Sequence, residues 1–267
     1  MSSNTMTDIY HFEAGTAPLL ISIPHLGSQI PEPLRPAMTA LALRSGDTDW
    51  HLDRLYAFAR GLGASFLWAR YSRYVVDLNR PPNDDDLYPG QAKTGLCPTH
   101  TFHGEPLYLD ARDSIPDTER EARRQAYWQP YHDKLRAEID RLKSQHGKVL
   151  LWEAHSIASV IPRLFEGKLP DLNIGTANGA ACGPALEAAI RRELEQGQYT
   201  WAINGRFKGG YITRHYGAPQ DNIHAIQLEM CQSTYMDETY PYAWRDEPAE
   251  RAGAAVERLV RSACAQL

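Results

Sequence analysis

The sequence predicts an α/β protein, a three-layer sandwich in which helices cover both faces of a mostly parallel, mixed sheet. Short apolar runs of strand length alternate along the chain with longer segments in which apolar residues recur with the helical period. The 267 residues contain no internal repeat, low-complexity tract or linker-like stretch. We therefore expect a single domain over residues 1–267.

The strands are predicted from apolar runs bounded by turn-forming residues. The two strongest runs are 18–24, which a proline-rich loop follows, and 149–152, which follows Gly147. Further strands are expected at 66–68, 74–78, 200–204 and 225–230.

The helices are predicted from their apolar periodicity and from residues that favour helix ends. Residues 49–61 form the first, with capping groups at Asp47, Thr48 and Asp49. A long charged helix is expected at 117–146, followed by helices at 184–196 and 248–266. Residues 81–116 are rich in Pro, Gly and Asp, which favours a functional loop or lid.

Composition excludes several classes of protein. A net charge of −5 and a pI near 6.1 are not typical of proteins that bind nucleic acid or a membrane surface. The N-terminus has no signal-peptide pattern, and no apolar run reaches the length of a membrane span. The cysteines lack the paired spacing of a disulfide framework or a zinc ribbon: Cys97, Cys182, Cys231 and Cys264. We expect a reduced, soluble, cytoplasmic protein, and the oligomeric state is not predicted.

Two histidines follow strong strand-like runs, namely His25 and His155. Ligands gather at the carboxyl ends of strands in open α/β sheets, so this placement suggests a metal site. A catalytic zinc site takes three protein ligands, and Asp47 or Asp49 would supply the third. Capping of the following helix is an equally simple role for either aspartate. His51 and Asp53 are further candidates in the same turn.

The segment 73–80 ends in Asn79 and Arg80, followed by two prolines. A guanidinium binds a carboxylate through two parallel hydrogen bonds, and an amide adds a donor. The alternative is that the arginine pairs with Asp77 or with the acidic run 84–86.

The segment 205–217 is basic and glycine-rich, but it matches neither a P-loop nor a dinucleotide fingerprint. It suits a small anionic substrate, and the alternative is a solvated basic loop. His215 is either a proton donor or a neutral hydrogen-bonding group. Glu229 lies inside an apolar run, where a carboxylate is costly unless it is paired or functional. We predict either a general base or a salt-bridged residue there.

Together these motifs resemble the N-formylglutamate amidohydrolase (N-formylglutamate deformylase) family over roughly residues 15–245. The resemblance rests on the following motifs: Ser22-Ile23-Pro24-His25, Asp47-Thr48-Asp49-Trp50-His51, Tyr71-Ser72-Arg73, Asp77-Leu78-Asn79-Arg80-Pro81, Ala154-His155-Ser156-Ile157, Asn204-Gly205-Arg206-Phe207-Lys208-Gly209-Gly210, Thr213-Arg214-His215-Tyr216-Gly217 and Gln227-Leu228-Glu229.

The resemblance implies a phosphorylase/hydrolase-like fold, similar to that of zinc carboxypeptidases and aspartoacylases. It also implies Zn²⁺ held by His25, an acidic residue and His155, although Asp and His ligands suit other divalent metals too. Zinc carboxypeptidases supply the acidic ligand in a His-x-x-Glu motif, which this chain lacks after His25. Asp49 is the expected replacement and Asp47 the second choice.

The remaining roles also come from the resemblance. Glu229 and His215 are expected to be catalytic, with Glu229 as general base. The expected substrate-binding residues are Arg73, Asn79, Arg80, Lys208 and Arg214.

The implied reaction is hydrolysis of N-formyl-L-glutamate to formate and L-glutamate, the closing step of one histidine-degradation route. The implied partner is this small molecule, with no nucleic acid and no membrane. Two alternatives stay open. One is an amidohydrolase for another N-acyl acidic amino acid, and the other is a non-catalytic anion-binding relative.

Overall fold

The computed structural model describes residues 4–6, 9–85 and 94–267, and within them one mixed sheet forms the centre of the molecule. Its eight strands lie in the order β1-β2-β4-β3-β5-β8-β6-β7. Strands β4, β3, β5 and β8 are parallel neighbours, whereas β6 pairs antiparallel with β8. The bounds are β1 Asn4–Met6, β2 Tyr10–Glu13, β3 Leu19–Ile23, β4 Ser65–Ala69, β5 Val149–Ile157, β6 Leu172–Gly175, β7 Trp201–Ile203 and β8 Ile223–Cys231.

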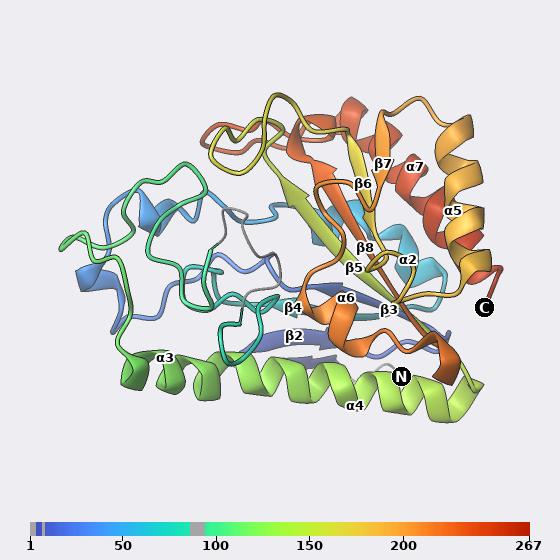
Figure 1. Cartoon of the computed structure of the whole chain (residues 1–267), viewed down its shortest axis with the longest axis horizontal. Helices are drawn as coiled ribbons and strands as arrows, with labels where there is room; N and C mark the ends of the chain where they lie inside the picture. Colours follow the sequence, from blue (N-terminus) through green and yellow to red (C-terminus); the bar gives the residue numbers. More distant parts are fainter. Residues whose placement is uncertain (1–3, 7–8, 86–93) are drawn as a thin grey trace.

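Helices cover both faces of this sheet, which confirms the predicted α/β class. Figure 1 shows α3 and α4 running along one face, with α5 and α7 beyond the other. The bounds are α1 Leu52–Leu55, α2 Phe58–Gly61, α3 Asp117–Arg123, α4 Gln129–His146, α5 Pro184–Gln196, α6 Tyr211–Tyr216 and α7 Asp246–Cys264. Short 3₁₀ turns lie at Arg35–Ala37, Ala42–Arg44, Pro219–Asp221 and Gln232–Thr234.

The apolar runs arise because both faces of the central strands are buried. In β3, Leu19 and Ile21 pack in one core with residues of α1, α2, α5 and α7. Leu20 points to the opposite face and packs in a second core with Leu135 and Ile139 of α4. Successive side chains of a strand point to opposite faces of the sheet and so pack in both cores. The strand is therefore apolar at every position, and this allowed β3 and β5 to be predicted from the sequence.

The long helix predicted at 117–146 is confirmed, with one irregularity. A π-helical turn at Arg124–Trp128 joins α3 to α4. Pro130 lies just after this turn, in the first turn of α4. A proline lacks the N–H of a regular helical bond and its ring clashes with the carbonyl four residues earlier. A wider turn at this point relieves that clash.

One prediction of secondary structure is wrong, and another is confirmed only in part. Residues 74–78 are not a strand, because the chain turns there: Val75 N–H donates to Ser72 O, and Asp77 N–H donates to Leu96 O. The run is apolar because this turning segment is itself buried. Residues 49–61 form two short helices, and α1 starts at a left-handed residue, His51, without a side-chain cap.

Four elements were not predicted: β1, β2, β6 and α6. Each is short, between three and six residues. In the described parts of 81–116, residues 81–85 and 94–116 contain neither an α-helix nor a strand, in agreement with the irregular region expected there. The rest of that region, 86–93, lies outside the described residues, and its role as a lid stays a prediction. No helix in the described ranges has the length and apolar character needed to cross a membrane.

Candidate metal centre and anion pocket

The sheet brings His25, Asp49 and His155 together. His25 lies two residues beyond the end of β3, and β3 is paired in parallel with β5. His155 lies within β5, which continues to Ile157, so this strand is longer than predicted. Asp49 comes from the segment before α1, and its N–H donates to the carbonyl of His25 at 2.9 Å. All three side chains are buried.

The three side chains form a compact set of ligand atoms. One nitrogen from each histidine and one Asp49 oxygen all lie within 4.8 Å of one another. Asp49 Oδ2 is 3.1 Å from His155 Nδ1 and 3.7 Å from His25 Nδ1. Among the described residues, Asp49 Oδ1 is buried without a hydrogen-bond partner. A divalent cation would satisfy this oxygen, and two imidazoles with a carboxylate suit such an ion.

Asp47 does not join this cluster. Its carboxylate accepts a hydrogen bond from the backbone N–H of Phe102 at 2.8 Å. Burial raises the pKa of Asp47, although Arg73 opposes this effect. Of the two aspartates considered from sequence, the structure therefore brings only Asp49 to the histidines.

A second layer of polar groups orients the histidines. His25 Nε2 lies 2.8 Å from Asp77 Oδ1, and Asp77 in turn pairs with Arg73 at 2.7 Å. His155 Nε2 lies 3.1 Å from the amide nitrogen of Asn79 and 3.7 Å from a Glu153 oxygen. A carboxylate on one ring nitrogen fixes the tautomer that leaves the other nitrogen for a metal. The sequence analysis considered Asp77 only as a partner of an arginine, and Arg73 is that arginine; the contact of Asp77 with His25 was not predicted.

Asp49 and His155 stabilise each other's charged forms when no metal ion is bound. Burial alone would raise the pKa of Asp49, but His155 and His25 lower it below its usual range. Burial alone would lower the pKa of His155, but Asp49 and Glu153 raise it. A metal ion binds the neutral imidazole, so a divalent cation would displace the proton of His155 and pair with the buried Asp49 carboxylate.

Glu229 lies beside this cluster. Strand β8 is parallel to β5, and Glu229 is directly paired in register with His155. Its side chain is 7% exposed and accepts a hydrogen bond from Gln227 at 3.3 Å. Burial raises the pKa of Glu229 to about 7, against the effect of His155. This places its proton exchange near neutrality, as a general acid–base group requires.

A pocket opens onto Glu229 and the two histidines. Three arginines line it, two of which, Arg73 and Arg80, were expected there. Arg80 is held by Thr94, whose carbonyl and hydroxyl accept its hydrogen bonds at 2.9 and 3.1 Å. The lining residues are His25, Arg73, Asn79, Arg80, Thr94, Phe102, His155, Ile157, Leu164, Arg206, Phe207, Gly210, Gln227 and Glu229.

The structure does not bring Lys208, Arg214 or His215 to this pocket. Part of the expected basic loop is helix α6, which buries Ile212 and Tyr216 and leaves His215 exposed. His215 stacks on Tyr211, with ring centroids 4.8 Å apart. The pocket instead receives Arg206, which sequence reasoning missed although it lies in a quoted motif.

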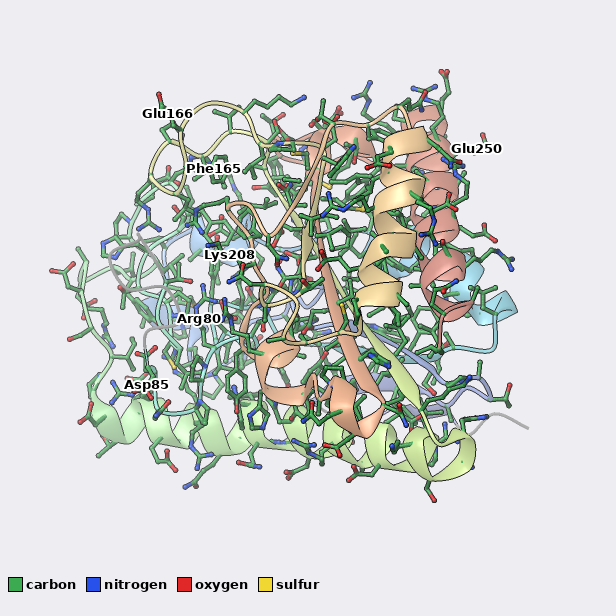
Figure 2. All side chains as sticks on the ribbon, turned by 45° about the vertical axis from the view of Figure 1, so that its right-hand side comes forward. Arg80, Asp85, Phe165, Glu166, Lys208 and Glu250 are labelled. Carbon is green, nitrogen blue, oxygen red and sulfur yellow. The ribbon has the colours of Figure 1, made fainter. Side chains whose placement is uncertain are left out.

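Arg214 makes a side-chain contact within its own loop, and Lys208 is held through its backbone. Arg214 Nε donates to the carbonyl of Gly209 at 2.8 Å, and the carbonyl of Lys208 accepts from Ala177 N–H. In Figure 2, Lys208 and Arg80 lie on the side of the molecule away from Glu250 of α7.

The fold and this site define a class of protein. An α/β sheet with a buried His-Asp-His cluster beside an arginine-lined pocket is typical of hydrolases that use a metal ion on anionic substrates.

Comparisons with known proteins agree that the chain is a hydrolase. The chain matches the family model of N-formylglutamate amidohydrolase over residues 17–236. It is 48% identical over 258 residues to an N-formylglutamate deformylase of Pseudomonas putida, with 96% of each chain covered. It is also 48% identical over 259 residues to an N-formylglutamate deformylase of Pseudomonas aeruginosa, again with 96% of each covered.

Two solved structures share the fold. An N-formylglutamate amidohydrolase from Ralstonia eutropha JMP134 aligns with a TM-score of 0.81 at 23% identity, over 96% of this chain and 98% of that one. A gene product of Agrobacterium tumefaciens aligns with a TM-score of 0.73 at 21% identity, over 96% and 95% of the two chains. The chain belongs to the N-formylglutamate amidohydrolase family and is thus an amidohydrolase.

Proposed function

We propose that this protein hydrolyses N-formyl-L-glutamate to formate and L-glutamate with the help of a divalent metal ion. The observation that carries the proposal is the position of Glu229, next to a His-Asp-His cluster and inside an arginine-lined pocket. The relatives from both Pseudomonas species carry the name of this activity. The cytoplasmic location and the single domain over residues 1–267 stay predictions from the sequence.

His25, Asp49 and His155 would hold the metal ion, and zinc is the ion we expect. Such an ion polarises a carbonyl oxygen and lowers the pKa of a nearby water toward about 7. Asp77 would keep the His25 ring in the orientation that this binding requires, because it lies at the opposite ring nitrogen. Asn79 and Glu153 flank the corresponding nitrogen of His155.

Glu229 would act as the general base. Its carboxylate accepts a proton from the attacking water while the water oxygen forms a bond to the formyl carbon. The same proton then passes to the nitrogen of the departing amine as the C–N bond breaks. Burial raises the pKa of Glu229, which favours uptake of the water proton by its carboxylate.

Asn79 and Arg80 would bind a carboxylate of the substrate. Arg80 is already oriented by Thr94, so little side-chain entropy is lost when an anion binds. Asn79 lies against His155, so the bound carboxylate would be close to the reacting amide.

The test is a paired measurement on protein purified without chelators. We expect about one equivalent of bound zinc, and release of formate and L-glutamate in equal amounts from N-formyl-L-glutamate. N-formyl-L-aspartate and N-acetyl-L-aspartate, assayed in parallel, should turn over more slowly. Metal-loaded protein that releases no formate would refute the proposal, and faster turnover of another substrate would reassign it.

A further inference from the structure

A dicarboxylate substrate carries two negative charges, and the pocket lining is rich in arginine. Three guanidinium groups line it in the described part of the chain: Arg73, Arg80 and Arg206. Arg73 is buried and pairs with Asp77 at 2.7 Å, and it lies 4.0 Å from Asp49. Its charge therefore balances the acidic groups around the metal centre. Arg80 and Arg206 are the other two guanidinium groups in the lining.

Arg80 and Arg206 come from different segments of the chain, Arg80 from the loop after β4 and Arg206 from the loop between β7 and α6. Arg80 follows Asn79, which contacts His155, so a carboxylate bound there lies next to the metal centre. In N-formyl-L-glutamate the carboxylate nearest the amide nitrogen is the one on the α-carbon. The carboxylate at the end of the side chain is two methylene groups farther away, and it requires another cation.

Arg206 is fixed by a contact between two loops. It lies in the loop between β7 and α6, and its Nε donates to the carbonyl of Leu164 at 3.0 Å. Leu164 belongs to the loop between β5 and β6, whose Phe165 contacts Phe207 edge to face. Figure 2 labels Phe165 in that loop, above Lys208. The guanidinium of Arg206 lies over the ring of Phe207, 5.2 Å from its centroid.

The wall around Arg206 is apolar. Phe102 and Ile157 belong to a small buried cluster against which Leu164 and Phe207 pack, and all four line the pocket. Apolar groups of this kind suit the two methylenes of a glutamyl side chain. An arginine at the edge of such a wall suits the carboxylate that ends that side chain.

We propose that Arg206, held by Leu164, selects substrates whose side chain ends in a carboxylate. This inference rests on the proposed deformylase function and names the group that binds the side-chain carboxylate of the substrate. It separates the roles of the two arginines: Arg80 binds near the reacting amide, and Arg206 sets the specificity for acidic side chains.

The test compares N-formyl-L-glutamate with N-formyl-L-glutamine, which has nearly the same shape without the distal charge. In Arg206→Met, kcat/KM for the glutamate substrate should fall about 10- to 100-fold, mainly through KM, because a charge-assisted pair is lost. The value for the glutamine substrate should change less than about threefold, since that pair is absent there. The ratio of kcat/KM for N-formyl-L-glutamate to kcat/KM for N-formyl-L-glutamine should therefore fall by nearly the same factor as kcat/KM for the glutamate substrate.

Three further variants control the experiment. Arg206→Lys keeps the charge but loses the planar fork, so it should retain part of the preference. Lys208→Met should leave the preference for the glutamate substrate unchanged. Lys168→Met removes a cation at an exposed position by the same substitution, and it should also leave the preference unchanged. Thermal unfolding and metal content verify that each variant is folded and loaded.

The outcomes separate this inference from the proposed function. An unchanged preference in folded Arg206→Met, or a loss of preference in Lys208→Met alone, would overturn the role of Arg206 while the deformylase function stands. Equal losses with both substrates in Arg206→Met would also overturn it, because a general disturbance of the pocket has that effect. A wild-type protein without activity on N-formyl-L-glutamate would overturn both.

Discussion

A single buried carboxylate, Asp77, links the metal centre to the wall of the pocket. It contacts His25 on one side and Arg73 on the other, and it also accepts the backbone N–H of Asn79 at 2.9 Å. Arg73 and His25 hold its pKa well below the usual range, although burial alone would raise it. The side chain therefore stays ionised and fixes three functional groups at once.

Replacement of Asp77 by Asn should weaken metal binding about 10- to 100-fold, because His25 loses the carboxylate that fixes its tautomer. The measurement is competition for zinc with a chromogenic chelator. Asp237→Asn, at an exposed position, is the matched control and should bind like the wild type. Unchanged zinc affinity in folded Asp77→Asn would show that His25 needs no such partner.

Glu229→Gln should lower kcat about 10²- to 10⁴-fold, since the amide has the same shape but cannot accept the proton of the water. Zinc content and thermal stability should stay near the wild-type values, because Glu229 is not one of the three residues whose ligand atoms cluster. Steady-state formate release and metal analysis measure the two effects. Wild-type turnover in the variant would remove Glu229 from the role of base.

At the scale of elements, the start of α6 is closely fitted to Asn79. Gly210 donates its N–H to Gln227 Oε1 at 2.7 Å, and the N–H of Ile212 donates to Asn79 Oδ1 at 2.8 Å. A Cβ added to Gly210 would lie 2.4 Å from Asn79 Nδ2, well inside contact distance. Glycine is therefore required there by the close approach of two segments.

Gly210→Ala should displace the Asn79 amide and reduce kcat/KM for N-formyl-L-glutamate about 10- to 100-fold, because small misplacements of binding groups are costly. Gly61→Ala is the matched control, since nothing lies within 4 Å of a Cβ at that position. Kinetics and zinc content of both variants make the test. If Gly210→Ala keeps wild-type kinetics, Asn79 does not have to occupy its observed position.

At the scale of the whole molecule, His132 joins the long helix α4 to the site. Its Nε2 lies 2.8 Å from the carbonyl of Leu78, and its Nδ1 lies 2.9 Å from the hydroxyl of Tyr216 in α6. The ring stacks on Trp128, with centroids 3.7 Å apart. Burial lowers its pKa to about 3, so the folded protein keeps this ring neutral.

Stability should therefore fall as the pH drops below the ordinary histidine pKa of about 6.5. In this range the unfolded chain binds a proton at His132 and the folded chain does not. At pH 5 the loss from this one residue is about 2 kcal/mol relative to pH 7.5. Urea unfolding of the wild type and of His132→Gln at the two pH values measures it. On acidification, the free energy of unfolding of the variant should fall by about 2 kcal/mol less than that of the wild type. An equal fall in both proteins would contradict the assignment to His132.

Sequence reasoning anticipated the cluster of His25, Asp49 and His155 better than the pocket wall. His25 and His155 were readable because each belongs to a segment that the sheet brings to one edge, and the choice of Asp49 came from the family motif. Residues 74–78 were misread, because a buried turn and a buried strand have the same apolar composition. The role of Asp77 was missed, because a charged residue inside such a run does not reveal its partners.

The sequence by itself determined the α/β class, the two strands that carry the histidines, and the types of side chain available for chemistry. Only the tertiary structure decided which arginine of the basic segment 205–217 enters the pocket. Arg206 is held by Leu164, 42 positions away in the chain, while α6 carries Arg214 and His215 elsewhere. The periodicity of apolar residues indicates which face of a helix or strand is buried, and this pattern is local in the sequence. The direction of a loop side chain depends on packing between distant segments, for which no local pattern exists.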